Sequence, residues 1–499
     1  MSKRFEYKDN EENISRIKSI DFGEIDGYGD PNLDEYFLDN DYWNKIVEEN
    51  VFFVLGRKGT GKSSIYRMIS EFGISQGYII ENKDFGEFPF ERLLKLDDSD
   101  FQQPNQYQTI WKNIILNIFA KTISENPLVD DNNNTHFTII NDYAKVCLGN
   151  LVDMHKEVVS RASKISNKLS FKLADVGSEK NCQITIGNGS NNISAINSTL
   201  YSEMVNYFMT CTTERKIIIQ FDRLDDNYNQ YQDLEQYYNS IISLFKVVYQ
   251  MNQEFRSKNI NGAKVILYLR TDIMRELGKR DAESARWDDF SFEINWSIVT
   301  KTDWENPMLL KMINKRISRS LPQTTFKDIF DNKAIDLTNF RGDVQDVFKY
   351  IIERTMHRPR DIIQFCKCIQ KEVSRTEKLY FRTIKDAEKA FGYWLINSEL
   401  ANEINPILKN SDVIYEMLKC LGRDNFSYNR FEQEYEKIKE QILIDANKLA
   451  FYLYDIGVFL NIDDRDKPVR IYSSFRNKGR FDKRMKIKIH PGVWVGLNA

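Results

Sequence analysis

Short, largely apolar runs alternate with longer amphipathic segments over the first part of the chain. Runs of this length that stop at turn residues predict buried β-strands. The predicted strands are 51–55, 78–80, 216–221, 264–269 and 290–294. Helical spacing of apolar residues lies between them, for example over 109–122 and 234–251. Strands that alternate with helices predict an α/β fold with a parallel sheet.

Two parts of this region depart from the alternation. Residues 1–45 are polar and acidic with glycine-marked loops, and we interpret them as an N-terminal extension to a core over 46–305. A long interval separates the second predicted strand from the third. Within it, 132–134 and 187–192 are rich in Asn, Gly and Ser, which predicts surface loops. We therefore expect an insertion around 125–210.

After the core, the pattern becomes helical, and 306–408 are predicted to form a helical lid. Its expected helices are 307–320, 342–354, 359–372 and 384–399. The last part of the chain, 409–499, has a different order of elements. It predicts three helices and then two strands, at 411–421, 427–441, 444–457, 469–475 and 485–490. Three helices followed by a two-stranded ribbon are typical of a winged helix-turn-helix.

Composition supports a folded protein and limits its partners. The chain is 41% hydrophobic, with 70 basic and 73 acidic residues and a formal net charge of −3. Global charge therefore predicts neither a nucleic-acid nor a membrane partner, so any such surface must be local. No apolar stretch approaches the length of a membrane helix, and the charged N-terminus lacks a secretory leader. We expect a cytoplasmic protein with no membrane partner.

The six cysteines and four histidines show no zinc-ligand spacing. We expect the cysteines to be reduced thiols that pack as small hydrophobic residues.

A phosphate-binding loop follows the first predicted strand and fits the pattern G-x-x-x-x-G-K-[ST]. Its predicted nucleotide contacts are Gly56, Arg57, Lys58, Gly59, Thr60, Gly61, Lys62, Ser63 and Ser64. Glycines let consecutive backbone N–H groups point at phosphate oxygens, and the following helix directs its positive N-terminus to the same place. Lys62 is suited to the β- and γ-phosphates and Ser63 to Mg²⁺. The motif predicts ATP and Mg²⁺ as ligands.

An apolar strand that ends in acid supplies a second nucleotide motif. Asp222, the last residue of Ile217-Ile218-Ile219-Gln220-Phe221-Asp222, is the predicted magnesium residue. The next position, where many P-loop ATPases place an acid that polarises water, is Arg223. Either Asp225 or Asp226 takes that role, or hydrolysis is slow. The alternative for a strand-end Asp is a turn or capping residue.

A third strand, 265–269, is followed by Arg270-Thr271-Asp272. Polar groups at the tip of a strand beside the magnesium strand can sense the γ-phosphate, so Arg270 is a candidate site residue. The alternative is a capping Asp and a solvated Arg. The sequence contains no Asn-Lys-x-Asp guanine motif and no Leu-Ser-Gly-Gly-Gln signature, which argues against a GTPase and an ABC-type ATPase.

Four segments in this order resemble bacterial P-loop ATPases of the AAA+/STAND and KAP-like kind. They are GRKGTGKSS (56–64), IIIQFDRLDD (217–226), VILYLRTDI (265–273) and MHRPRDIIQF (356–365). The KAP-like form of the second motif is Asp-Asp-Leu-Asp, and here Arg223 replaces the second Asp. The resemblance implies an AAA+-like P-loop core with a helical lid, and genes of this kind often lie beside antiviral defence genes.

The resemblance also implies that Arg358 or Arg360 is the lid residue that contacts nucleotide phosphates. From the residues alone, Arg-Pro-Arg-Asp predicts the start of a helix, because Pro359 suits a first-turn position and Asp361 suits the positive end of the helix dipole. The alternative is a surface helix start without a ligand.

Basic residues concentrate near the C-terminus, over 465–488. The ten are Arg465, Lys467, Arg470, Arg476, Lys478, Arg480, Lys483, Arg484, Lys486 and Lys488. A basic wing can lie along a phosphate backbone, so this segment is a candidate DNA contact. The presumed recognition helix 444–457 carries only Lys448, which argues against base reading. Protein docking and a merely solvated hairpin are the alternatives.

Together these features predict an ATP-binding and ATP-hydrolysing regulatory ATPase of a prokaryotic antiviral defence system. It would act through homo-oligomerisation or a partner effector such as a nuclease, since the sequence shows no nuclease, protease or NADase constellation of its own. One alternative is a DNA-binding motor or loader similar to replication-initiator ATPases. The other is a scaffold that binds nucleotide without hydrolysing it.

Overall fold

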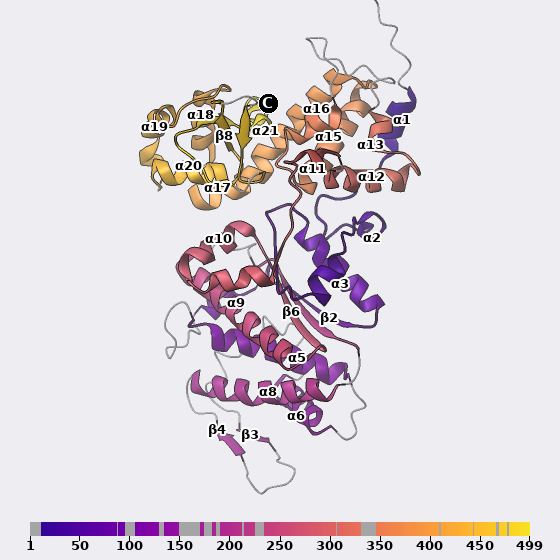
Figure 1. The fold of residues 1–499 in the computed structure, drawn as a ribbon, viewed down its shortest axis with the longest axis vertical. Coiled ribbons are helices and arrows are strands. Elements are labelled where there is room, and N and C mark those ends of the chain that lie inside the picture. Colours follow the sequence, from indigo (N-terminus) through magenta and orange to yellow (C-terminus); the bar gives the residue numbers. More distant parts are fainter. Residues whose placement is uncertain are drawn as a thin grey trace, which may run out of the picture. The chain divides into compact units, whose positions relative to one another are not determined.

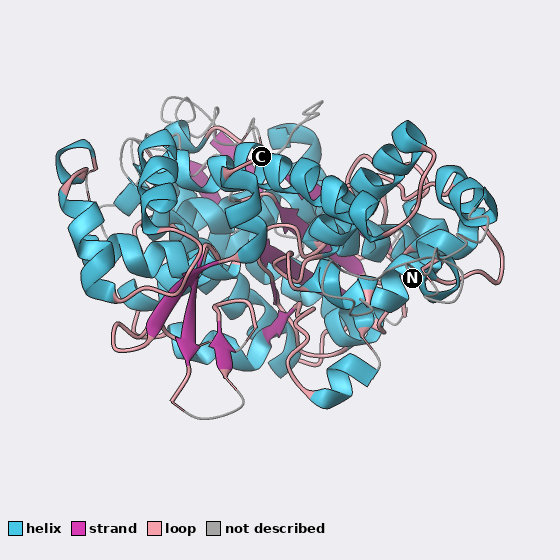
Figure 2. Ribbon diagram, turned by 90° about the horizontal axis from the view of Figure 1, so that it is seen from above, coloured by secondary structure: helices cyan, strands magenta, loops and turns pink. Residues whose placement is uncertain are grey.

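The fold was analysed in a computed structural model, which forms two compact units (Figure 1). The sheet unit comprises 40–58 and 65–294, and the helical unit comprises 1–39, 59–64 and 295–499. The structure describes residues 11–86, 88–94, 105–128, 134–148, 170–173, 182–185, 190–211, 214–224, 234–305, 307–330, 346–408, 411–442, 444–465, 469–476 and 479–499. Most of these residues are helical (Figure 2). The four-part division into extension, core, lid and winged helix stays a prediction.

Within the described residues of the sheet unit, five parallel strands form one sheet in the order β2-β5-β6-β1-β7. They are β1 (Phe53–Leu55), β2 (Ile79–Asp84), β5 (Ile217–Asp222), β6 (Ala263–Leu269) and β7 (Ser291–Glu293). All five strand predictions are confirmed. The three central strands are fully buried, which explains their unbroken apolar runs. Strand β2 lies at the edge, is half-exposed, and continues to Asp84, beyond its predicted end.

Helices cover this sheet. Figure 1 shows α5 (Gln108–Glu125), α8 (Ser190–Thr210) and α9 (Leu234–Ser257) packed together, and α9 also contacts β6. Helix α5 is buried around most of its circumference because it lies between other elements of the unit. The prediction of a loop over 187–192 is wrong at its end: Ser190 starts α8, and 187–189 lie outside the described residues. Asn134, in the other predicted loop, caps α6 (Thr135–Tyr143).

A chain of hydrogen-bonded polar side chains ties three strands to the helix that follows the P-loop, α3 (Lys62–Ser75). Tyr268 donates to Gln220 at 2.6 Å, Gln220 donates to Asn82 at 3.1 Å, and Asn82 donates to Ser70 of α3 at 2.7 Å. Gln220 is fully buried, so its amide depends on these partners. The chain fixes α3 against the sheet.

In the helical unit, the lid helices are α12 (Met308–Ser320), α14 (Val347–Ile352), α15 (Pro359–Thr376) and α16 (Phe381–Trp394), which continues into a π-helical turn (Leu395–Leu400). Residues 342–345 of the second predicted helix lie outside the described residues. The predicted start of α15 is confirmed: Pro359 is its first residue, and Asp361 accepts a hydrogen bond from the Met356 amide at 2.9 Å.

The N-terminal extension contains two helices that its polar sequence did not predict, α1 (Glu11–Ser19) and α2 (Leu33–Tyr36). Helix α1 packs on α15, and α2 packs on α12. Ile17 and Ile20 are buried in the lid core, and Leu33 is also buried. The side-chain amide of Gln370 in α15 donates to the carbonyl of Ile20 at 2.6 Å. The extension is therefore part of the lid core rather than a solvated tail.

The terminal domain (411–499) belongs to the same unit. It contains α18 (Ser411–Leu421), α19 (Tyr428–Glu436), α20 (Ala446–Asp455), β8 (Phe459–Asp463), β9 (Arg470–Tyr472), β10 (Lys486–Ile489) and α21 (Pro491–Leu497). The predicted two-stranded ribbon is wrong, because β9 and β10 do not pair with each other. Both pair antiparallel with β8, one on each side. Strand β8 follows α20 directly, and Asn461 and Asp463 interrupt its apolar run, so the sequence pattern did not predict it.

Close backbone contacts join the terminal domain to the lid helices. A side-chain carbon at Gly496 of α21 would lie 2.2 Å from the carbonyl oxygen of Gly392 in α16. One at Gly492 would lie 2.2 Å from the carbonyl oxygen of Arg354. Only glycine allows α21 to pack this closely against its neighbours. Across the described residues, no helix combines the length and apolar character needed to cross a membrane.

Candidate nucleotide-binding site

The P-loop has the local geometry that its motif predicts. Strand β1 ends at Leu55, and the Gly56 amide donates to the carbonyl of Leu269 at 3.2 Å. Gly59 and Gly61 have φ angles of 78° and 94°, which a residue with a side chain rarely adopts. Helix α3 begins immediately afterwards at Lys62. The loop therefore curls at the N-terminus of a long helix, where backbone N–H groups favour anions.

Residues of the helical unit hold the tip of this loop. The Trp296 indole donates to the Thr60 carbonyl at 2.9 Å, and Thr60 is buried. The Arg360 amide donates to the Gly59 carbonyl at 3.4 Å. A side-chain carbon at Gly59 would lie 3.2 Å from Cβ of Arg360. Gly59 is thus required both by its backbone angle and by the space beside it.

The N-terminal extension also reaches the start of α3. A side-chain carbon built at Gly27 would lie 1.9 Å from Oγ of Ser64. Gly27 therefore allows the extension to lie directly over a predicted nucleotide contact. The sequence marks Gly27 only as a loop residue, and nothing in the local pattern indicates this approach.

The predicted magnesium residue lies at the carboxyl edge of the sheet. Asp222 ends β5 and is 1% exposed. Because β1, β6 and β5 are parallel, Asp222, the start of the P-loop and Arg270 follow strand ends on the same edge. Strand β6 lies between the other two, so Arg270 follows the strand beside the magnesium strand, as predicted. The roles of Asp222 and Ser63 as magnesium ligands stay predictions.

Arg223 occupies the sequence position at which many P-loop ATPases place an acid. It adopts a left-handed backbone with φ of 61°, and its guanidinium pairs with Asp84 at 3.0 Å. Asp84 ends β2 and is the register partner of Asp222. The sequence did not indicate Asp84, because its strand was predicted to stop at residue 80. Asp225 and Asp226 lie outside the described residues.

The other predicted contacts are paired within the protein. The guanidinium of Arg270 forms two hydrogen bonds to Asp272, at 3.0 and 2.6 Å. Arg358 is 1% exposed and pairs with Asp361 at 2.9 Å. Burial acts to lower the pKa of Arg358, but Asp361 and two further carboxylates, Glu399 and Glu403, raise it.

Arg360 is more accessible than Arg358. It pairs with Glu399 at 3.1 Å, and its backbone touches the P-loop at Gly59. Both lid candidates lie at the loop, because a side-chain carbon at Gly59 would also be 3.5 Å from Cδ of Arg358. Arg360 is the more accessible of the two.

Several of the predicted DNA-contacting cations are paired within the terminal domain. Arg465 pairs with Asp463 at 2.8 Å, Arg484 with Asp482 at 2.9 Å and Lys486 with Asp464 at 2.6 Å. Lys467 and Lys478 lie outside the described residues. Along Lys486-Ile487-Lys488-Ile489 the side chains alternate, since both isoleucines are buried and both lysines are at least partly exposed. Among the described residues, no group of three or more His, Cys, Asp or Glu is placed to hold a metal ion.

Comparisons with known proteins give three similarities. Residues 307–399 match the family described as the FunZ-associated C-terminal helical domain. The chain is 24% identical over 512 aligned positions to a putative transposon gamma-delta 80.3 kDa protein of Escherichia coli (strain K12), covering 96% of this chain and 67% of that protein. Among solved structures, it is similar to a Walker-type ATPase of Pyrococcus abyssi, with 14% identity, a TM-score of 0.38 and coverage of 92% and 95% of the two chains.

Proposed function

We propose that this chain binds ATP with Mg²⁺ at residues 56–64 and hydrolyses it as a regulatory P-loop ATPase. The observation that carries the proposal is the P-loop itself, with its two left-handed glycines and a helix that begins at Lys62. In this arrangement, backbone N–H groups and Lys62 would hold the phosphates, and Ser63 and Asp222 would hold the metal. Bound Mg²⁺ would neutralise charge on the phosphates during transfer.

The contacts of the loop tip suggest how nucleotide would act on the lid. Trp296 contacts Thr60, and Arg360, at the start of α15, contacts Gly59. A ligand that orders the loop would therefore also affect the position of the start of α15. This supports a switch in which the nucleotide state is passed to the lid and terminal domain. Homo-oligomerisation, an effector protein such as a nuclease, and a role in antiviral defence are the further parts of the proposal, and they rest on the resemblance alone.

A DNA-handling ATPase is the second candidate. Three helices followed by a sheet in the terminal domain support a winged-helix arrangement, and Arg480 and Lys483 are exposed on it. The E. coli relative is named as a transposon protein, which also favours work on nucleic acid. ATP turnover that rises when duplex DNA is added would favour this candidate over the regulatory switch.

The Lys62→Ala variant tests the proposed nucleotide site. Removing the cation that meets the β- and γ-phosphates should weaken ATP binding at least tenfold, or about 1.4 kcal/mol. Titration with a fluorescent ATP analogue measures the change. Lys311→Ala is the matched control, because Lys311 is an exposed lysine outside the motif. Equal affinity in the parent and the Lys62 variant would show that the P-loop is not the site.

Hydrolysis needs a separate test, because Arg223 follows Asp222. If Asp225 or Asp226 supplies the missing carboxylate, its change to Asn should abolish turnover and leave ATP affinity nearly intact. Parent-like turnover in both Asn variants would contradict that role. A parent protein that holds ATP without turnover would be the non-hydrolysing scaffold.

A further inference from the structure

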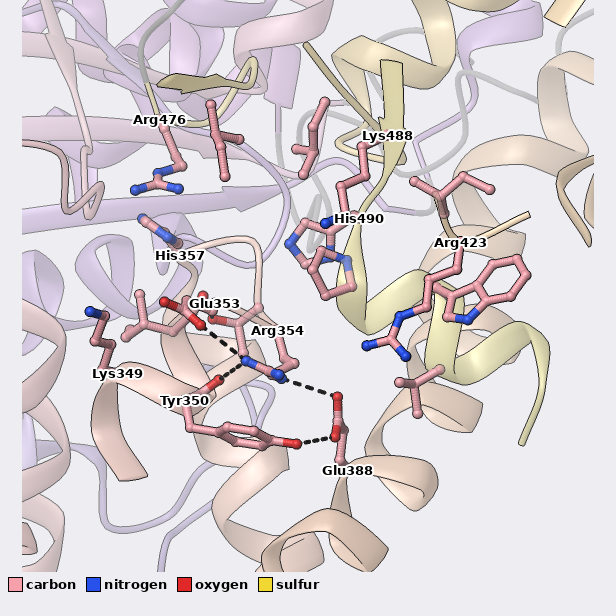
Figure 3. A pocket seen from close by; sticks show the side chains of 18 of the residues that line it. Lys349, Tyr350, Glu353, Arg354, His357, Glu388, Arg423, Arg476, Lys488 and His490 are labelled. Atoms are coloured by element: carbon pink, nitrogen blue, oxygen red, sulfur yellow. Dashed lines mark hydrogen bonds and ion pairs between the residues drawn. The ribbon is translucent and has the colours of Figure 1, made fainter. Parts of the chain in front are cut away.

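A large cleft in the helical unit lies between the lid helices and the terminal domain, and we call it the basic cleft (Figure 3). Its volume is about 1410 Å³. Residues from α14 and α16 line one side, and residues around α18, β10 and α21 line the other. Most small-molecule pockets occupy roughly 300–1000 Å³ and are mainly apolar. The basic cleft is larger and has many charged residues.

Cations outnumber anions among the described lining residues. The basic ones are Lys349, Arg354, Lys385, Lys389, Arg423, Arg476 and Lys488, and the acidic ones are Glu353 and Glu388. Both carboxylates pair with a single guanidinium, that of Arg354, at 3.1 and 3.2 Å. Figure 3 shows this group of three at the centre of the cleft. The acids therefore do little to offset the remaining cations.

Arg476 is partly withdrawn from water. Its Nε has almost no accessible surface and no hydrogen-bond partner among the described residues. Burial lowers the pKa of Arg476, and Glu353 raises it only in part. The imidazole of His490 also lines the cleft. Burial and the positive charges of Arg354 and Arg476 lower its pKa to about 3. Withdrawing a cation from water without a close counterion is costly, so this part of the cleft favours an anion.

Three more cations form no ion pair with any described residue. Lys349 and Arg423 are exposed, and Figure 3 shows them on opposite sides of Arg354. Lys488 is half-exposed on β10, near His490. Positive groups on both walls, at several positions along the cleft, match a chain of phosphates better than one compact anion.

Aromatic side chains lie among these cations. Trp304 and Trp494 line the cleft and are only partly buried. Tyr350 and Phe381 also belong to the lining. A groove that combines cations for the backbone with aromatic rings for the bases is the usual way to bind a single strand. Bases in a duplex are already stacked and cannot reach such rings.

We propose that the basic cleft binds single-stranded nucleic acid. Its cations hold the phosphates, and Trp304 and Trp494 stack on bases. The site goes beyond the P-loop and does not depend on it. It differs from the predicted contact over 465–488, because most of its cations come from the lid helices and from Arg423. Through this cleft, the proposed ATPase would bind a nucleic-acid strand directly.

The test uses the full chain and a fluorescein-labelled oligothymidylate of about 16 nucleotides, the upper end of a common site size. The Lys349→Gln/Arg423→Gln double variant removes two exposed cations that make no ion pair, so folding should be unaffected. We expect affinity to fall at least tenfold. The slope of log affinity against log salt should flatten by about 1.4, since each single-strand phosphate contact contributes about 0.7. Trp494→Ala should weaken binding at least fivefold through lost stacking.

Lys311→Gln/Lys327→Gln is the matched control. It removes the same charge from exposed residues that do not line the cleft, and it should retain nearly the parent affinity. Equal loss in both double variants would overturn the cleft as the site. The absence of strand binding at low salt would also overturn the proposal. Displacement of the strand by pyrophosphate at an equal phosphate concentration would overturn it too, because it would indicate a site for a small anion. Tighter binding of duplex than of single strand would also contradict the proposal. ATP affinity measured in the same variants reports on the P-loop separately. Failure of the cleft proposal can therefore be distinguished from failure of the proposed nucleotide site.

Discussion

The P-loop and the basic cleft both favour anions, but they are built in opposite ways. The P-loop is a run of eight consecutive residues whose chemistry lies mainly in the backbone, at Gly59, Gly61 and the first turn of α3. The cleft collects side chains from Trp304 to Asn498 on many elements. A site made of backbone amides needs special φ angles, so its glycines leave a signature in the sequence. A site made of side-chain charges on packed elements leaves none.

The two sites also differ in what maintains them. The P-loop depends on local geometry between β1 and α3. The cleft exists because α21 lies against α16 and the end of α14, where Gly496, Gly392 and Gly492 have no Cβ at the closest backbone contacts. Changes at these glycines should therefore affect the cleft far more than the P-loop.

The largest effect is expected for Gly496→Val. The new Cβ would lie 2.2 Å from the Gly392 carbonyl oxygen, so α21 must move, and overpacking of this kind costs about 3 kcal/mol. Urea unfolding should show this loss, and oligothymidylate affinity should fall at least tenfold while ATP affinity changes little.

Gly29→Val is the control for this change, because the nearest atom to its Cβ would be 3.7 Å away. If ATP affinity fell together with strand affinity in the Gly496 variant, the two sites would be parts of one cooperative structure. That result would contradict the claim that the P-loop is maintained independently of the cleft.

A smaller, pH-dependent effect is expected at His490. Its Nδ1 accepts a hydrogen bond from the Gly492 amide and caps α21, while burial and Arg354 lower its pKa to about 3 from an ordinary 6.5. Between these values the unfolded chain binds a proton and the folded chain does not. Stability is therefore complete above pH 6.5 and falls as pH decreases toward 3, by up to about 1.4 kcal/mol per unit.

His490→Asn keeps a good capping residue without a titrating ring. Unfolding free energies of the parent and this variant, measured from pH 7 to pH 4, should converge or cross as the pH falls. Parallel curves would show that His490 is not held neutral. The P-loop contains no such group, so ATP affinity should lack this dependence.

The smallest effect is expected at the carboxyl edge of the sheet. Asp84→Asn removes the partner of Arg223, and because the pair is half-exposed the unfolding free energy should change by less than about 1 kcal/mol. Glu81→Gln, which breaks the pair with Lys83 on the same strand, is the matched control. Similar ATP turnover in both variants is expected. A loss of ATP turnover in the Asp84 variant alone would indicate that this carboxylate takes part in ATP hydrolysis.

Much of the sheet unit and the P-loop could be predicted because each signal is local. Buried strands such as β5 and β6 are continuous apolar runs, and the P-loop is contiguous. The start of α15 at Pro359 follows from residues that suit a first helical turn. In contrast, β8 was missed because Asn461 and Asp463 interrupt its apolar run, and Asp84 was missed because β2 continues past its apolar residues.

The sequence by itself determined the parallel α/β core, the loop with its required glycines, and the strand that carries Asp222. Only the tertiary structure decided that α1 and α2 belong to the lid core, that Gly27 lies over Ser64, and that β9 and β10 flank β8. It alone also brought Lys349, Arg423 and Arg476 to one cleft. The physical reason is that these features depend on pairing and packing between segments far apart in the chain, and residue spacing carries no record of such contacts.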